Sequence, residues 1–168
     1  MDYSITTQEI EAQPVIVGRR RVARAEIATA IGDVLPRVFR YAQERGIAIA
    51  GQPFVRSLDG GGDVMTLEPG MPVAEGPEPE DVRDRTGEDE ALQEAGLTRG
   101  TLPGGRVATT VHTGSYESLH RAYASLEAWI GAEGLTAAAP PWESYLTDPT
   151  AVPDPADWKT RIYWPVSG

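Results

Sequence analysis

The stretch that decides the fold of this chain is Pro140-Pro141-Trp142-Glu143-Ser144-Tyr145-Leu146-Thr147-Asp148-Pro149. Prolines bracket a short run of aromatic and β-favouring residues, which predicts one strand. Because side chains alternate between the two faces of a strand, Glu143 and Tyr145 point to one side and Trp142 points to the other. The acid is therefore either a solvated carboxylate on an edge strand or a carboxylate held inside an aromatic pocket.

The same design occurs 88 residues earlier in the chain. At this offset Gly46 matches Gly134, and the pairs Pro53/Pro141, Phe54/Trp142 and Leu58/Leu146 also match. A stripe of helical positions keeps the same register: Ile31/Leu119, Val34/Ala122, Leu35/Tyr123, Val38/Leu126 and Tyr41/Trp129. Further on, Pro72-Val73 matches Pro165-Val166 at an offset of 93. A whole stripe in register indicates an internal repeat.

Each half reads as strand–helix–strand–strand. In the first half we expect strands near 3–11, 14–18, 52–58 and 64–67, with a helix that ends at the C′ glycine Gly46. Since Pro36 belongs in a first turn, we expect the regular part of this helix to start nearer residue 33 than residue 27. In the second half we expect strands over 106–112, 142–147 and 160–166, with a helix between the N-cap Ser115 and Gly134.

These elements predict an α+β fold of two pseudo-symmetric strand–helix–strand–strand (SHS2) modules that form an antiparallel sheet with a central ligand cleft. We expect a single domain over 1–168, with the first repeat at about 3–73, an acidic connector at 74–98 and the second repeat at about 99–166. A short helix is expected within the connector, over 89–94.

Glu143 is peculiar to the second repeat, because it aligns with Val55 in the first. Tyr145 likewise aligns with Ser57. The repeated scaffold therefore accepts an apolar residue where the second copy has an acid. This difference gives a functional carboxylate in a pocket the same weight as a solvated one, and both interpretations remain open at this point.

Composition narrows the classes of function. The chain has 168 residues, no cysteine and a formal net charge of −10, which excludes disulfides and argues against nucleic-acid binding. No signal peptide or membrane-spanning run is evident, so we expect a cytoplasmic protein without a membrane partner. His112 and His120 have no second ligand at metal spacing, and no phosphate-binding glycine loop occurs, so neither a metal nor a cofactor is expected.

The residues of the second half resemble the GyrI-like small-molecule-binding domain, which also serves as the effector-binding part of AraC- and MerR-type transcription regulators. The resemblance is carried by the segments 102–108, 112–119, 123–130 and 143–149 and by the closing Pro165-Val166. It is looser but continuous over 3–73. Regulators of this family also carry a DNA-binding domain; here the N-terminus leads directly into the sensor domain, so we expect no operator binding by this chain itself.

The resemblance implies a cleft for bulky, often cationic, aromatic molecules, with the family's buried glutamate at Glu143 and an aromatic wall position at Tyr163. Tyr145 lies on the same strand face as Glu143, and Tyr116 at the start of the helix can reach the mouth of the cleft. For each of these three tyrosines, core packing is the alternative.

Three functions remain open. The first is a stand-alone binder that senses or sequesters hydrophobic, cationic or aromatic compounds. The second is a hydrolase of reactive natural products, as some family members are, in which Glu143 acts as general base. The third is a protein-interaction module like the gyrase inhibitor that names the family, with the acidic segment 75–94 as its contact surface.

Overall fold

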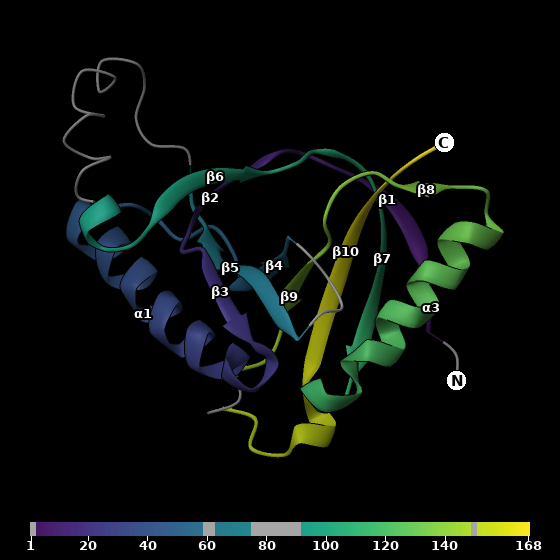
Figure 1. Cartoon of the computed structure of the whole chain (residues 1–168). Helices are drawn as coiled ribbons and strands as arrows, with labels where there is room; N and C mark the ends of the chain where they lie inside the picture. Colours follow the sequence, from purple (N-terminus) through teal and green to yellow (C-terminus); the bar gives the residue numbers. More distant parts are fainter. Residues whose placement is uncertain (1–2, 59–62, 75–91, 149–150) are drawn as a thin grey trace. The chain divides into compact units, whose positions relative to one another are not determined.

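The computed structural model describes residues 3–58, 63–74, 92–148 and 151–168. The chain divides into two compact units, which are treated separately below. Unit 1 comprises Met1–Glu11 and Pro103–Gly168, and unit 2 comprises Ala12–Leu102. Both units combine a helix with antiparallel strands, which confirms the predicted α+β class (Figure 1).

Unit 1 is a sheet with one long helix packed on it. Its strands are β1 (Thr6–Ile10), β7 (Gly105–Thr113), β8 (Thr136–Ala137), β9 (Trp142–Tyr145) and β10 (Lys159–Ser167). Within the unit β7 pairs with β1 and β10, and β10 also pairs with β9 and β8. The chain leaves β7 through the 3-10 helix η3 (Tyr116–Ser118) into α3 (Leu119–Ala132), which packs against β7 and β10. A second 3-10 helix, η4 (Pro155–Asp157), precedes β10.

Unit 2 repeats the arrangement. Its elements are β2 (Gln13–Val17), β3 (Arg20–Ala23), the 3-10 helix η1 (Arg24–Glu26), α1 (Ile27–Arg45), β4 (Phe54–Ser57), β5 (Val64–Pro72) and β6 (Thr98–Leu102). Strand β5 pairs with β2, β3 and β4, while β2 also pairs with β6. Helix α1 packs against β5, β3 and β2 (Figure 1). The first strand of this module is thus β2, whereas β1 pairs with β7 in unit 1.

Strand pairing confirms the repeat at the level of single residues. Val55 pairs with Pro69 in unit 2, and Glu143 pairs with Ile162 in unit 1. The bridge between Ile49 and Val73 recurs between Ala137 and Val166. In both cases the first partner is displaced by 88 positions and the second by 93, as the two sequence offsets predict.

The two long helices end in the same way. Gly46 and Gly134 have φ of 67° and 72°, the left-handed conformation that favours glycine. In each module the residue after the glycine donates to a carbonyl in the last turn, Ile47 to Ala42 at 2.8 Å and Leu135 to Ile130 at 3.0 Å. Both bonds belong to a glycine-terminated helix end, which confirms the predicted stops.

The predicted start of α1 was wrong. The helix runs from Ile27 to Arg45 and contains Pro36 in its interior. The first turns stay helical because Ala30 and Val34 are buried against the sheet. Pro36 itself is on the exposed side, where the missing N–H costs least. Tertiary packing therefore outweighs the local preference of proline.

Two expectations concern residues that lie mostly outside the described ranges: the acidic segment and the short helix within it. Most of the acidic segment 75–94 and most of the expected helix 89–94 lie outside them, although residues 92–94 are helical.

Ser115 does precede η3, but its side chain makes no capping hydrogen bond. Among the described residues, no helix has the length and apolar character that crossing a membrane requires.

Each unit has a hydrophobic core between its helix and one face of its sheet. In unit 2, Val34 and Val38 of α1 pack with Ile16 and Val73. In unit 1, Ala122 and Leu126 of α3 pack with Ala108 and Ile162, and all eight of these residues are buried. The sheet face turned toward the helix is thereby defined in each unit.

Candidate functional site

Glu143 lies at the centre of a hydrogen-bonded group in unit 1. The Tyr123 hydroxyl donates to Oε1 of Glu143 at 2.7 Å, and the Tyr145 hydroxyl donates to Oε2 at 3.0 Å. Tyr145 and Glu143 both come from β9, and Tyr123 comes from α3. Each carboxylate oxygen thus accepts one hydrogen bond from a phenol hydroxyl, and each can accept another.

The strand alternation explains this meeting. Glu143 pairs with Ile162, which belongs to the core beneath α3, and directly paired residues share a face of the sheet. Tyr145 is two residues further on and points to the same side. Glu143 and Tyr145 are therefore turned toward the helix, from which Tyr123 reaches them.

Further aromatic rings continue the group. The Tyr116 ring lies 5.5 Å from that of Tyr145 and 4.8 Å from that of Trp158, centroid to centroid. Trp158 is fixed by its indole N–H, which donates to the Val152 carbonyl at 2.7 Å. Tyr116 is 39% exposed, so it forms the outer edge of the aromatic group.

The electrostatics follow from burial. Burial raises the pKa of Glu143 above its ordinary 4.5, and the hydrogen bonds from Tyr123 and Tyr145 partly offset that rise. Burial and then the charge of Glu143 raise the pKa of Tyr123 and of Tyr145 well above 10.0. The pKa of Tyr116 is raised by burial and by the charges of Glu143 and Asp148. The tyrosines are therefore neutral donors, and burial favours the protonated form of the Glu143 carboxyl group.

The structure brings three of the four residues proposed from the sequence together. Glu143, Tyr145 and Tyr116 form one continuous group. Tyr163 pairs with Trp142, and the two rings stack at 5.4 Å with 20° between their planes. Since Trp142 is adjacent to Glu143 on β9, this stack lies on the opposite face of the sheet from the carboxylate.

Sequence reasoning missed Tyr123 and Trp158. Tyr123 was assigned to the apolar stripe of the helix, where its equivalent in the other module is Leu35. A signal was nevertheless present, because a buried tyrosine hydroxyl requires a partner and Glu143 also stands at an apolar position of the repeat. For Trp158, which lies between η4 and β10, the sequence offers no comparable signal.

The site has no features of a metal centre. Within the ranges that the structure describes, no three His, Asp or Glu side chains are grouped so as to hold an ion. Both carboxylate oxygens of Glu143 face phenol donors, which are not a set of metal ligands. The arrangement can instead stabilise a positive charge beside aromatic surfaces, or hold a proton on the carboxyl group.

Comparison with known proteins places this geometry in context. The family model of the GyrI-like small molecule binding domain matches residues 1–167. Among solved structures, the chain is similar to the C-terminal domain of EcmrR, with 22% identity, a TM-score of 0.81 and 99% of each chain covered. A comparison with curated proteins found no match.

Two further structures share the fold at lower identity. One is a hydrolase from Listeria innocua, with 14% identity, a TM-score of 0.65, and 97% of this chain and 91% of that chain covered. The other is SAV2435 bound to tetraphenylphosphonium, with 14% identity, a TM-score of 0.59, and 100% and 95% covered. The match of the family model over nearly all residues decides the assignment: this chain belongs to the GyrI-like small molecule binding domain family.

Proposed function

We propose that the protein binds bulky hydrophobic cations with aromatic character, and that Glu143 is their counter-charge. The observation that carries this proposal is the Glu143 carboxylate, which receives hydrogen bonds from Tyr123 and Tyr145 at 2.7 and 3.0 Å beside further aromatic rings. A carboxylate in such surroundings attracts a cation, and the rings attract both its charge and its apolar surface.

The energetics favour a charged ligand. Burial raises the pKa of Glu143, so ionising the carboxyl group costs free energy in the ligand-free protein. A nearby positive charge lowers that cost, and each aromatic face adds about 0.5–2 kcal/mol when a cation lies over it. The binding free energy therefore depends on the charge of the ligand more than on its exact shape.

Specificity is expected to be broad. The polar groups that meet at Glu143 already satisfy one another, so a ligand without hydrogen-bonding groups leaves none of them unpaired. Flat apolar walls discriminate poorly between ligands that differ by a few carbon atoms. The solved relative that carries tetraphenylphosphonium, a cation with four phenyl groups, supports this class of ligand.

Tetraphenylphosphonium is a suitable probe. We expect saturable binding by isothermal titration calorimetry, weakened about tenfold or more in Glu143→Gln, since losing about 1.4 kcal/mol of charge–charge attraction weakens binding tenfold. Glu127→Gln, which removes an exposed acid from α3, is the matched control and is expected to bind within about twofold of the parent. Equal affinity of Glu143→Gln and the parent protein would contradict the proposal.

A second candidate, a hydrolase, is favoured by the convergence of two phenols on one carboxylate. Glu143 with its raised pKa can act as general base toward a water molecule, and a tyrosine hydroxyl can donate to the leaving oxygen of a strained electrophile. Turnover of an epoxide or similar substrate that disappears in both Glu143→Gln and Tyr123→Phe would establish this activity. Binding without turnover leaves the first candidate.

The third candidate, a protein-interaction module, depends on the segment 75–94, most of which lies outside the described residues.

A further inference from the structure

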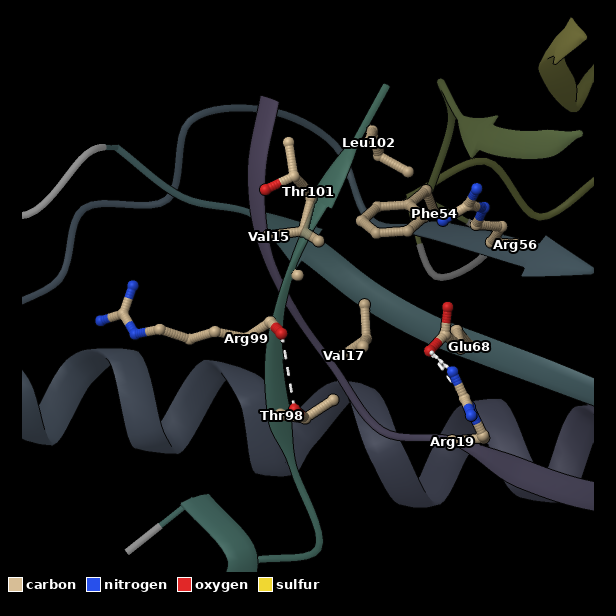
Figure 2. Close-up of a pocket in the computed structure, with 11 residues that line it drawn as sticks. Val15, Val17, Arg19, Phe54, Arg56, Glu68, Thr98, Arg99, Thr101 and Leu102 are labelled. Carbon is tan, nitrogen blue, oxygen red and sulfur yellow. Dashed lines mark hydrogen bonds and ion pairs between the residues drawn. The ribbon is translucent and has the colours of Figure 1, made fainter. Parts of the chain in front are cut away.

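Unit 2 contains a cavity of about 280 Å³ that involves neither Glu143 nor its tyrosines (Figure 2). Its walls come from β2, β4, β5, β6 and the link between β2 and β3, and they include Val15, Val17, Arg19, Phe54, Arg56 and Glu68. Ile16, between Val15 and Val17, belongs to the core beneath α1. The cavity therefore lies on the sheet face that is turned away from that helix.

Positive charge predominates in this cavity although the whole chain is acidic. Arg19, Arg56 and Glu68 line it, whereas the net charge of the protein is −10. Arg99 also borders the cavity, but it pairs with Ile16 on the face turned toward α1, and its guanidinium points away from Arg56 and Glu68 (Figure 2). The glutamate, Glu68, is only 7% exposed, and its Oε2 accepts hydrogen bonds from Arg19 at 3.0 and 3.3 Å. Arg19 thus compensates the single negative charge of the lining, as the dashed lines in Figure 2 show.

Arg56 carries the charge that remains. It stands directly opposite Glu68 in the β4–β5 ladder, on the same sheet face as Phe54. Its Nε–H is buried and has no hydrogen-bond acceptor among the described residues. A buried donor without an acceptor is destabilising, the more so on a charged group, because it has lost its hydrogen bonds to water.

The remaining lining is apolar or small. Val15, Val17, Phe54 and Leu102 are all buried side chains of the unit, so they give the cavity an apolar wall. Ligand pockets in proteins measure roughly 300–1,000 Å³, so this cavity is suited to a molecule with one ring. The cavity therefore pairs one unsatisfied cationic donor with an apolar surface.

We propose that this cavity is a second ligand site, which binds a small organic carboxylate through Arg56 and holds its apolar body against Phe54, Val15 and Val17. An anion supplies the acceptor that Nε of Arg56 lacks and the charge that the arginines favour. The ligand class is opposite in charge to that proposed for Glu143, so the two sites are chemically independent.

The repeat shows that this site is particular to unit 2. The equivalents of Arg56 and Glu68 in unit 1 are Ser144 and Arg161, which pair with each other in the β9–β10 ladder. The stacked pair Trp142 and Tyr163 corresponds to Phe54 and Gly70, which has no side chain. The second copy thus lacks the cation at the position of Arg56, and the Tyr163 ring stands where unit 2 has only Gly70.

Benzoate, its neutral isostere benzamide and inorganic phosphate test the proposal. We expect saturable benzoate binding by calorimetry and about tenfold or weaker binding of benzamide, because a charge-assisted hydrogen bond is worth about 1.5–3 kcal/mol. Phosphate is expected to bind more weakly than benzoate, because it gains nothing from the apolar wall. Equal binding of benzamide and benzoate, or phosphate binding as tight as benzoate, would overturn the proposal.

Two further measurements locate the anion. Arg56→Gln is expected to lose benzoate binding about tenfold, whereas Arg40→Gln, which removes an exposed arginine of α1, stays within about twofold. If Arg56→Gln does not fold, the arginine Nε–H spectrum of the parent protein decides instead. One buried Nε–H signal is expected to move downfield as benzoate is added, while Glu143→Gln leaves the benzoate titration unchanged. A benzoate titration that moves no arginine Nε–H signal contradicts the proposed site.

Discussion

Three residue differences between the repeats account for the hydrogen-bonded cluster around Glu143 in unit 1. The first module has Leu35, Val55 and Ser57 where the second has Tyr123, Glu143 and Tyr145. Placed singly, a buried carboxylate or a buried phenol is costly, because each requires a partner. Together they satisfy one another through bonds of 2.7 and 3.0 Å. The three residues therefore form one hydrogen-bonded cluster added to a repeated scaffold.

The titration of Glu143 leads to a prediction about stability. Its pKa is raised in the folded protein, so folding favours the protonated form, and the stability from this group is greatest below the ordinary pKa of 4.5 and is lost as pH rises through the raised value. Glutamine does not titrate. The melting temperature of Glu143→Gln relative to the parent is therefore expected to increase from about pH 4 to about pH 8. Thermal melts at a series of pH values measure this difference, and a difference that falls with rising pH would contradict the assignment.

At the residue scale the sequence predicted part of the site. Glu143 and Tyr145 could be paired because strand alternation fixes which neighbours share a face. Tyr163 could not be placed, because its face depends on the β9–β10 register, which sets it opposite Trp142. Tyr123 could not be separated from the core stripe, since a tyrosine on an apolar helix face packs like any other aromatic residue.

At the scale of the elements, the two helix ends offer a matched pair of tests. Gly46 and Gly134 have positive φ, and a Cβ added at either position meets no other atom within 4 Å. Alanine there costs backbone strain alone, about 1–2 kcal/mol for each residue. Gly46→Ala and Gly134→Ala are therefore expected to lower the free energy of unfolding in urea by similar amounts.

Gly32 supplies the control for this pair. It lies inside α1, has an ordinary helical φ, and also leaves space for a Cβ. Gly32→Ala is expected to stabilise the protein by about 0.5–1 kcal/mol, because alanine is the better helix former. Stabilisation by alanine at Gly46 or Gly134 would show that these glycines do not end the helices as described.

The elements also show where sequence patterns stop being informative. Helix ends were predicted well because glycine at positive φ is a local requirement. The start of α1 was predicted poorly because it depends on Ala30 and Val34 packing on the sheet, which no local rule about Pro36 includes. Strands β3 and β8 are short and depend on pairing with β5 and β10, so they had no signal of their own.

For the whole molecule, duplication was the strongest signal in the sequence. One offset of 88 and another of 93 predicted both modules, and the same offsets reappear in the strand ladders at Val55–Pro69 and Glu143–Ile162. A repeat also separates scaffold from function, because residues that differ between copies are free of the shared structural requirement. By this criterion Glu143 in unit 1, which aligns with Val55, and Arg56 in unit 2, which aligns with Ser144, are two charged residues that the shared scaffold does not require.

The central claim, that Glu143 recognises the positive charge of a ligand, is tested most directly with two molecules of similar shape. Methyltriphenylphosphonium is a cation, and triphenylphosphine oxide is a neutral molecule with the same three phenyl groups. Calorimetry of both ligands with the parent protein and with Glu143→Gln yields the coupling between the two charges. We expect the parent to prefer the cation by about tenfold or more, and Glu143→Gln to bind both about equally. An undiminished preference for the cation in Glu143→Gln would contradict the account.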